Sequence, residues 1–124
     1  MALPACLSAA GFGLLPDTDL VAPALMWCET RSTLHELVWR REVSPADGEA
    51  ALEALERCGV RRARARGLGL EAWRIADELG WAKTYDAEYV ALARLLGCRV
   101  VTLDTRLQRG AERLDLVVSL DDLT

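Results

Sequence analysis

The sequence predicts an α/β protein, a three-layer α/β/α sandwich in which helices cover both faces of a mostly parallel central sheet. Two observations carry this prediction: short β-branched runs alternate with helical segments, and the helical segments have their own start and stop signals. Strands separated by helices can lie parallel because each crossover returns the chain to the same end of the sheet. With 124 residues, 52% of them hydrophobic, the chain is expected to form a single domain over 1–124.

The first half of the chain is expected to contain a short strand followed by two helices. Residues 20–23, LVAP, have the pattern of a brief strand whose proline opens a helix, and apolar residues continue that helix to about Arg41. A second helix is expected to begin with Ser44 as its N-cap and Pro45 in its first turn, and to stop at Gly59.

A basic segment, VRRARAR at 60–66, follows these helices. It is expected to be a short strand that presents Arg62, Arg64 and Arg66 on one face. These arginines, with Arg106 further along, are candidates for contact with RNA phosphates, because phosphate affinity follows clustered charge. An acidic surface of a partner protein is a second candidate for the basic segment. The alternative is a solvated edge strand whose charges discourage pairing between sheets.

The second half is expected to continue the alternation. A helix over 69–80 should end at Gly80, and Thr84 should cap the next helix, which Gly97 ends. The run RVVTLD at 99–104 predicts a strand, followed by a helical turn and a last strand in LDLVVSL at 114–120. The helix after Thr84 is expected to place on one face the apolar and aromatic residues Tyr85, Tyr89, Leu92, Ala93 and Leu96.

Three carboxylates stand where they can be either local capping residues or metal ligands. Asp104 follows a hydrophobic run, where an aspartate most often caps the next helix, although ligands of open parallel sheets also bind there. Asp86 is expected at the second position of its helix, where its charge favourably meets the helix dipole. Glu29 lies in a largely apolar helix, so it either reaches solvent or faces a site. If a helix and strand return Asp86 and Asp104 to one sheet edge, the concentrated negative charge needs a cation.

The chemistry of these donors favours a hard cation. Carboxylates without a histidine or thiol partner select Mg²⁺ or Mn²⁺ over zinc, and such ions polarise phosphoryl oxygens and activate water. Hydrolysis of a phosphodiester is therefore the natural reaction class. Two other signals are weaker: DTD at 17–19 resembles the Asp-x-Asp of haloacid-dehalogenase-type phosphatases without closing a strand, and His35 is expected to be structural.

Composition excludes several classes of protein. A net charge of −4, with 14 of 15 basic residues arginine, argues against a general nucleic-acid coat but not against local contact. No apolar run approaches the roughly 20 residues of a membrane span, and the N-terminal segment lacks the basic residues of a signal peptide. We therefore expect a soluble, cytoplasmic protein. The four cysteines form no close pair and are expected to be buried thiols in a reducing compartment.

Three segments, in order, resemble PIN-domain ribonucleases, specifically VapC-like toxins of bacterial type II toxin–antitoxin systems. LVAPALMWCETRSTL (20–34) is similar to the family's proline-containing helix start with its glutamate. TYDAEYVALA (84–93) resembles the family's most recognisable motif, and VVTLDTRL (100–107) resembles the strand and aspartate that follow it. Each segment alone is a weak signal, whereas the three in this order are specific.

The resemblance implies a PIN-like fold with a metal-dependent active site. In that site Glu29, Asp86 and Asp104 coordinate Mg²⁺ or Mn²⁺, with Ser32 and Thr102 in the polar surround. The implied activity is hydrolysis of RNA phosphodiesters by an endoribonuclease, the toxin of a toxin–antitoxin pair. The implied partners are RNA, a cognate antitoxin whose tail covers the site, and a second copy of the chain in a homodimer.

One family feature is not matched, the central strand that ends in a first aspartate. ALPACLSAAGFGLL (2–15) is similar to the helix that normally follows that strand, so the domain is expected to be N-terminally shortened. A misassigned start codon, a deliberately shortened chain and a degenerate toxin are three open explanations. The last leads to an alternative function, a catalytically degenerate PIN-fold module that binds antitoxin or RNA without cleaving.

Overall fold

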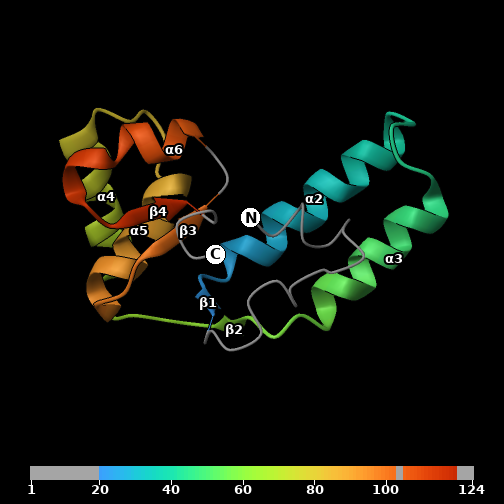
Figure 1. Cartoon of the computed structure of the whole chain (residues 1–124), viewed down its shortest axis with the longest axis horizontal. Helices are drawn as coiled ribbons and strands as arrows, with labels where there is room; N and C mark the ends of the chain where they lie inside the picture. Colours follow the sequence, from blue (N-terminus) through green and yellow to red (C-terminus); the bar gives the residue numbers. More distant parts are fainter. Residues whose placement is uncertain (1–19, 103–104, 120–124) are drawn as a thin grey trace. The chain divides into compact units, whose positions relative to one another are not determined.

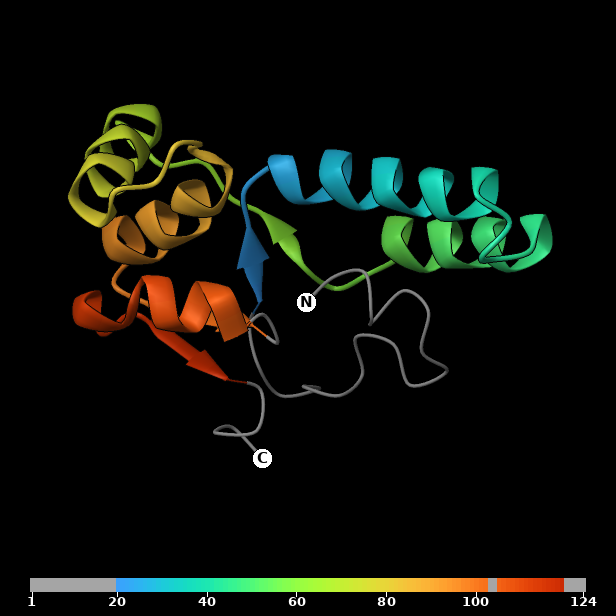
Figure 2. The same ribbon diagram turned by 90° about the horizontal axis from the view of Figure 1, so that it is seen from above.

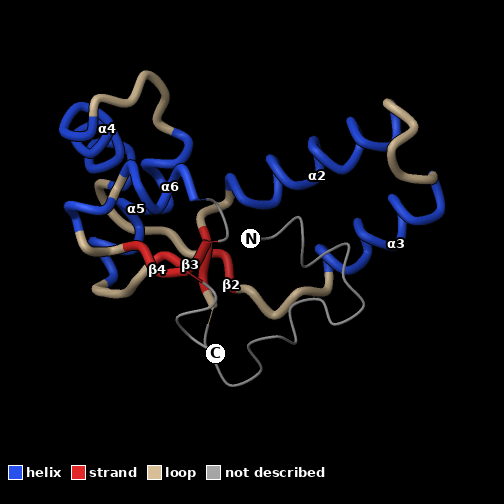
Figure 3. The backbone as a smooth tube through the Cα atoms, turned by 45° about the horizontal axis from the view of Figure 1, so that its top comes forward, coloured by secondary structure: helices blue, strands red, loops and turns tan. Residues whose placement is uncertain are grey.

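The computed structural model describes residues 20–102 and 105–119, without the side chains at 101, 102, 105, 118 and 119 (Figure 1). The chain divides into two compact units, Ala2–Arg62 and Ala63–Thr124, here called the N-terminal and C-terminal units. Within the described residues, each unit contains one pair of parallel strands together with helices. The predicted α/β class and the parallel pairing are confirmed, and most of the described chain is helical (Figure 3).

The N-terminal unit is a helical hairpin attached to a short strand pair (Figure 2). Its elements, in chain order, are β1 (Val21–Ala22), α2 (Leu25–Trp39), α3 (Pro45–Glu56) and β2 (Arg61–Arg62). The two helices run side by side and pack against each other, and each has a buried face. The buried residues are Met26, Trp27, Thr30 and Leu34 on α2, and Gly48, Ala51 and Leu55 on α3.

The start of α3 follows its sequence signals, but its end does not. The Ser44 hydroxyl accepts a hydrogen bond from the Asp47 backbone N–H at 3.1 Å, and Pro45 is the first helical residue, as predicted. The helix ends at Glu56, so the prediction that Gly59 ends it is wrong. The Cys58 N–H donates to the Leu55 carbonyl at 3.3 Å, which tightens the last turn before Gly59 is reached.

The strand predicted over 60–66 is confirmed only at Arg61–Arg62. β2 pairs in parallel with β1, with Arg61 opposite Val21 and Arg62 opposite Ala22. β1 is followed at once by Pro23, which has no amide hydrogen to donate, so β2 has no ladder partner beyond Ala22. The expected array of three arginines along one strand face therefore does not form, because residues 63–66 leave the strand.

The C-terminal unit packs helices against a second parallel strand pair. Its elements are α4 (Leu68–Leu79), α5 (Tyr85–Leu96), β3 (Val100–Thr102), α6 (Thr105–Gly110), the 3₁₀ helix η2 (Glu112–Leu114) and β4 (Val117–Ser119). Val100 lies opposite Val117 in the register, and its N–H donates to the Leu116 carbonyl at 2.8 Å. Gly80 and Gly97 end α4 and α5 with φ of 72° and 70°, left-handed conformations that favour glycine, as predicted.

The core of the C-terminal unit is made mostly of small residues. Its buried members are Ala72, Ile75, Ala76, Ala87, Val90, Ala91, Leu107 and Ala111. Their small side chains let α4 and α5 approach closely, so the buried face of α5 includes Ala87 and Val90. The predicted face of α5 is wrong at its two ends, because Tyr85 is 53% exposed and Leu96 is 46% exposed.

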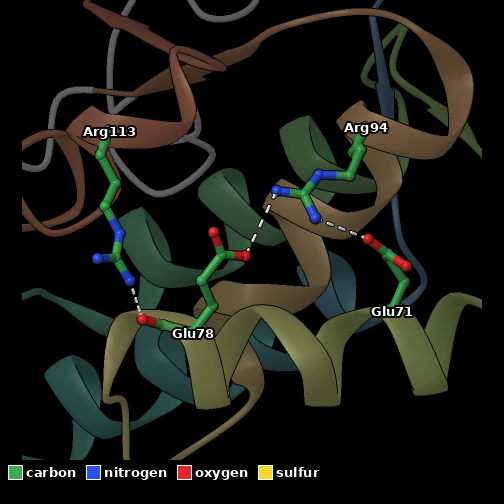
Figure 4. A network of polar contacts seen from close by, with 4 residues as sticks. All are labelled: Glu71, Glu78, Arg94 and Arg113. Atoms are coloured by element: carbon green, nitrogen blue, oxygen red, sulfur yellow. Dashed lines mark hydrogen bonds and ion pairs between the residues drawn. The ribbon is translucent and has the colours of Figure 1, made fainter.

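A polar network joins α4, α5 and the region of η2 on the surface of this unit (Figure 4). The Arg94 guanidinium on α5 lies 2.9 Å from a Glu71 carboxylate oxygen and 3.8 Å from a Glu78 carboxylate oxygen, both on α4. Arg113 in η2 donates a hydrogen bond to the Glu78 backbone carbonyl. One arginine thus connects two turns of α4 to α5.

Two of the three described cysteines lie at the surface of the protein. Cys28 and Cys98 are exposed and Cys58 is half-buried, so the prediction of buried thiols is wrong for the first two; all three are free thiols. Cys28 lies on the outer face of α2, and Cys98 follows the glycine that ends α5. Within the described ranges, no helix combines the length and apolar character needed to cross a membrane.

Candidate functional site

Helix α2 positions Glu29 and Ser32 of the predicted site. Glu29 is the fifth residue of α2 and is half-buried, while Ser32, one turn later on the same side, is exposed. The Thr33 hydroxyl donates to the Glu29 backbone carbonyl at 2.9 Å, one turn back along α2. Glu29 therefore lies at the edge of the buried face, where a carboxylate avoids the cost of full burial.

Asp86 is the second residue of α5, as predicted, and its side chain is exposed. Thr84 occupies the predicted N-cap position, but its hydroxyl accepts no hydrogen bond from the helix, so the prediction that its side chain caps α5 is wrong. The Thr84 carbonyl accepts from the Glu88 N–H at 3.0 Å. No ion pair or hydrogen bond joins the Asp86 carboxylate to another residue of the described chain. The helix dipole favours its negative charge, and no described side chain neutralises it.

The other predicted residues of the C-terminal unit lie around the end of β3. Thr102 is the last residue of β3, and the predicted ligand Asp104 lies outside the described residues. Only residues 97–99 connect α5 to β3, so the helix and strand run in opposite directions. The amino end of α5, which carries Asp86, therefore lies on the same side of the unit as the carboxyl end of β3.

The structure places the four predicted RNA-contact arginines in different settings. The Arg62 guanidinium carbon lies 4.7 Å from the centroid of the Trp27 ring, a cation–π contact. Arg64 and Arg66 are exposed in the segment between β2 and α4, and Arg106 is exposed in α6. Trp27 was not among the predicted site residues, because no local pattern in the sequence indicates that a tryptophan in α2 meets an arginine from β2.

A surface hollow of about 580 Å³ follows the outer side of α2. Its described lining residues are Cys28, Arg31, Ser32, His35, Glu36 and Trp39. His35 is exposed and Trp39 is 77% exposed, so neither contributes to the core of the hairpin. His35 was expected to be structural, but it does not take part in core packing.

The predicted metal ligands belong to different units, because Glu29 lies in the N-terminal unit and Asp86 in the C-terminal unit. Within the described side chains, no three of His, Cys, Asp or Glu gather closely enough to hold a metal ion. The set of Glu29, Asp86 and Asp104 stays a prediction, since Asp104 is outside that range. The donors themselves fit a hard cation, because Asp86 offers exposed oxygen atoms without a competing cationic side chain among the described residues.

Comparison with known proteins gives one family and a group of similar chains. The PIN-domain model matches residues 8–113. The VapC ribonuclease Mb0985 of Mycobacterium bovis is 41% identical over 94 residues, which cover 76% of this chain and 72% of the relative. Ribonuclease VapC9 of two Mycobacterium tuberculosis strains, CDC 1551 and H37Rv, matches with the same identity and coverage.

Proposed function

The chain belongs to the PIN-domain family as a VapC-like member, and from this we propose that it is a metal-dependent endoribonuclease, the toxin of a toxin–antitoxin pair. The reaction is hydrolysis of RNA phosphodiesters. The relatives' names state ribonuclease activity, and the matched region covers more than two thirds of each chain. The family match extends over both units, which supports one PIN domain over 1–124.

Asp86 is the structural observation that carries this proposal. It lies in the segment that most resembles the family, at the start of α5, with an exposed carboxylate that no described cationic side chain neutralises. A carboxylate serving only a structural ion pair would have such a partner. This environment supports a role for Asp86 in binding a cation.

The proposed cation is Mg²⁺ or Mn²⁺, with Glu29, Asp86 and Asp104 as its protein ligands. When bound, it would supply Lewis-acid polarisation of the phosphoryl group and activation of water. Ser32, exposed one turn after Glu29, and Thr102, at the end of β3, are proposed to hydrogen-bond water or substrate beside the ligands. The arginines Arg62, Arg64, Arg66 and Arg106 are proposed to hold RNA phosphates.

A cleavage assay tests this function. The purified chain should cleave single-stranded RNA with Mg²⁺ or Mn²⁺, and EDTA should stop cleavage. Asp86→Asn should abolish it, whereas Asp77→Asn, an exposed aspartate of α4 outside the resembling segments, should leave it unchanged. Cleavage that survives both EDTA and Asp86→Asn would overturn the mechanism, and RNA or antitoxin binding without cleavage would support the degenerate module instead.

We further propose a cytoplasmic homodimer whose activity a cognate antitoxin blocks. Support comes from large apolar side chains that the described surface exposes, including Trp39 at 77% and Trp73 at 63%. Such side chains are enriched at protein interfaces. Light scattering coupled to size-exclusion chromatography should give twice the chain mass of 13.6 kDa, and a monomer at micromolar concentration would contradict the dimer.

A further inference from the structure

Arg62 differs from the other arginines of the basic segment because its guanidinium rests on an aromatic ring. The distance from its Cζ to the Trp27 ring centroid is 4.7 Å, within the range of an effective cation–π contact. Trp27 is only 7% exposed, so the packing of α2 holds the ring in place. No carboxylate within residues 20–102 or 105–119 forms an ion pair with Arg62.

The position of Arg62 in the N-terminal unit follows from the strand register. Arg62 is paired with Ala22, and both residues end their parallel strands. The carboxyl end of a parallel strand pair is where ligands of open α/β sheets bind. α2 begins from this same end after Pro23, with Trp27 as its third residue and Glu29 two residues later.

We propose that Arg62 binds a phosphate of the RNA substrate and that Trp27 is the residue that positions it. This inference rests on the proposed ribonuclease function and deepens it by singling out Arg62 among the four proposed phosphate contacts and by assigning the residue that positions it. The N–H donors of a guanidinium lie in its plane, so a ring that contacts the face of the group leaves them available for the bidentate contact that phosphate favours. The contact also orders the arginine before RNA arrives, which lowers the entropic cost of binding.

The first test compares two arginine variants. Arg62→Gln should weaken binding of a fluorescein-labelled single-stranded RNA of about 20 nucleotides, followed by anisotropy in EDTA so that no cleavage occurs. We expect RNA affinity to fall about three- to tenfold. The magnitude of the slope of log affinity against log salt should fall by about 0.7, the value for one phosphate contact on a single strand. The matched control is Arg41→Gln, which should change neither quantity. Arg41 is exposed and lies past the far end of α2, about 20 Å from Trp27 along the helix axis.

The second test separates positioning from charge. Trp27→Leu keeps the charge of Arg62 and most of the apolar volume but removes the ring, so it should weaken RNA binding and raise KM with little change in kcat. Trp27→Phe retains a ring and should have the smaller effect. In a double-mutant cycle, Trp27→Leu should add little to Arg62→Gln, because both remove the same contact. Circular dichroism melts confirm folding. If Trp27→Leu does not fold, Trp27→Phe takes its place in the cycle, and the smaller loss of RNA affinity that it causes should disappear in the Arg62→Gln background.

The outcomes distinguish this inference from the function on which it rests. A wild-type chain that neither binds nor cleaves RNA overturns both. A wild-type chain that binds and cleaves, with Arg62→Gln equal to wild type or to Arg41→Gln in salt slope, overturns the phosphate contact alone. Loss of thermal stability in Trp27→Leu with unchanged RNA affinity and KM shows that the stacking is purely structural and overturns the positioning role.

Discussion

The absence of a side chain at Gly48 allows α3 to pack closely against Val38 of α2. Gly48 is buried in α3, and a Cβ at this position would lie 2.4 Å from the Cγ2 atom of Val38 on α2. Real Cβ contacts of that length essentially do not occur, so the helices or the valine would have to shift. Glycine costs helix propensity, which the close packing of α2 on α3 offsets.

Gly48→Ala should therefore destabilise the protein although alanine is the better helix former. The expected loss in free energy of unfolding is about 1–3 kcal/mol from overpacking, measured by urea denaturation. Gly59→Ala is the matched control, because a Cβ there meets nothing within 4 Å. Its stability should stay within about 0.5 kcal/mol of wild type or rise slightly. Equal effects of the two substitutions would contradict the packing argument.

Asp86 is the residue at which activity and stability should separate. Its carboxylate is exposed and has no partner among the described residues, so Asp86→Asn loses only the favourable interaction with the α5 dipole. We expect a cost below about 1 kcal/mol in thermal or urea unfolding, together with complete loss of RNA cleavage. A collapse of stability in this variant would show that the aspartate is structural and would remove the support it gives to a metal site.

At the scale of elements, α4 and α5 are joined by a small-residue core and by Arg94 at the surface. The Glu71 side chain is only 17% exposed and that of Arg94 is 36% exposed, so their ion pair is more sheltered than an ordinary surface pair. The pair Arg40 and Glu36, by contrast, joins residues one turn apart and is more than half exposed at both ends. Shelter from water reduces screening and makes the first pair the stronger one.

A double-mutant cycle on Glu71→Ala and Arg94→Ala should measure this difference. We expect a coupling of about 0.5–1 kcal/mol at low salt, and about 0.3–0.5 kcal/mol for the same cycle on Glu36 and Arg40. In about 1 M salt the coupling of the exposed pair should nearly vanish while part of the other remains. Equal couplings that respond equally to salt would show that the α4–α5 pair adds no more than a solvated contact.

The ends of elements were predictable to different degrees. Pro45, Gly80 and Gly97 mark helix ends in the sequence as they do in the structure, because capping depends on backbone geometry within one turn. The end of β2 was not predictable from its own residues. It depends on the length of β1 and on the proline that follows it, which belong to a distant part of the sequence.

At the scale of the whole molecule, the metal should stabilise the folded chain whether or not RNA is present. A ligand at about ten times its Kd adds about 1.4 kcal/mol to folding, a rise in Tm on the order of 5 °C for a domain of this size. Melting with millimolar MnCl₂ should show this rise for wild type and Asp77→Asn, and a clearly smaller rise for Asp86→Asn. Sodium chloride of equal ionic strength is the control, and equal shifts in all three proteins would argue against the proposed ligand.

The sequence by itself determined the family and the most important candidate residue. Three ordered segments pointed to a PIN-domain ribonuclease, and the family match and the VapC relatives agree. The capping and stop signals around residues 84–97 put Asp86 at the second position of its helix, and the structure confirms that position. These conclusions depend on short segments, in which residue type and spacing carry the information.

Tertiary structure alone decided which faces are buried and which distant residues meet. Nothing near Arg62 in the sequence distinguishes it from Arg64 or Arg66, yet among the described residues it is Arg62 that rests on Trp27. The exposure of Tyr85 and Leu96 likewise depends on where α4 packs on α5, not on the periodicity of α5. The physical reason is that caps and motifs depend on neighbours along the chain, whereas burial and stacking depend on partners that only folding brings into contact.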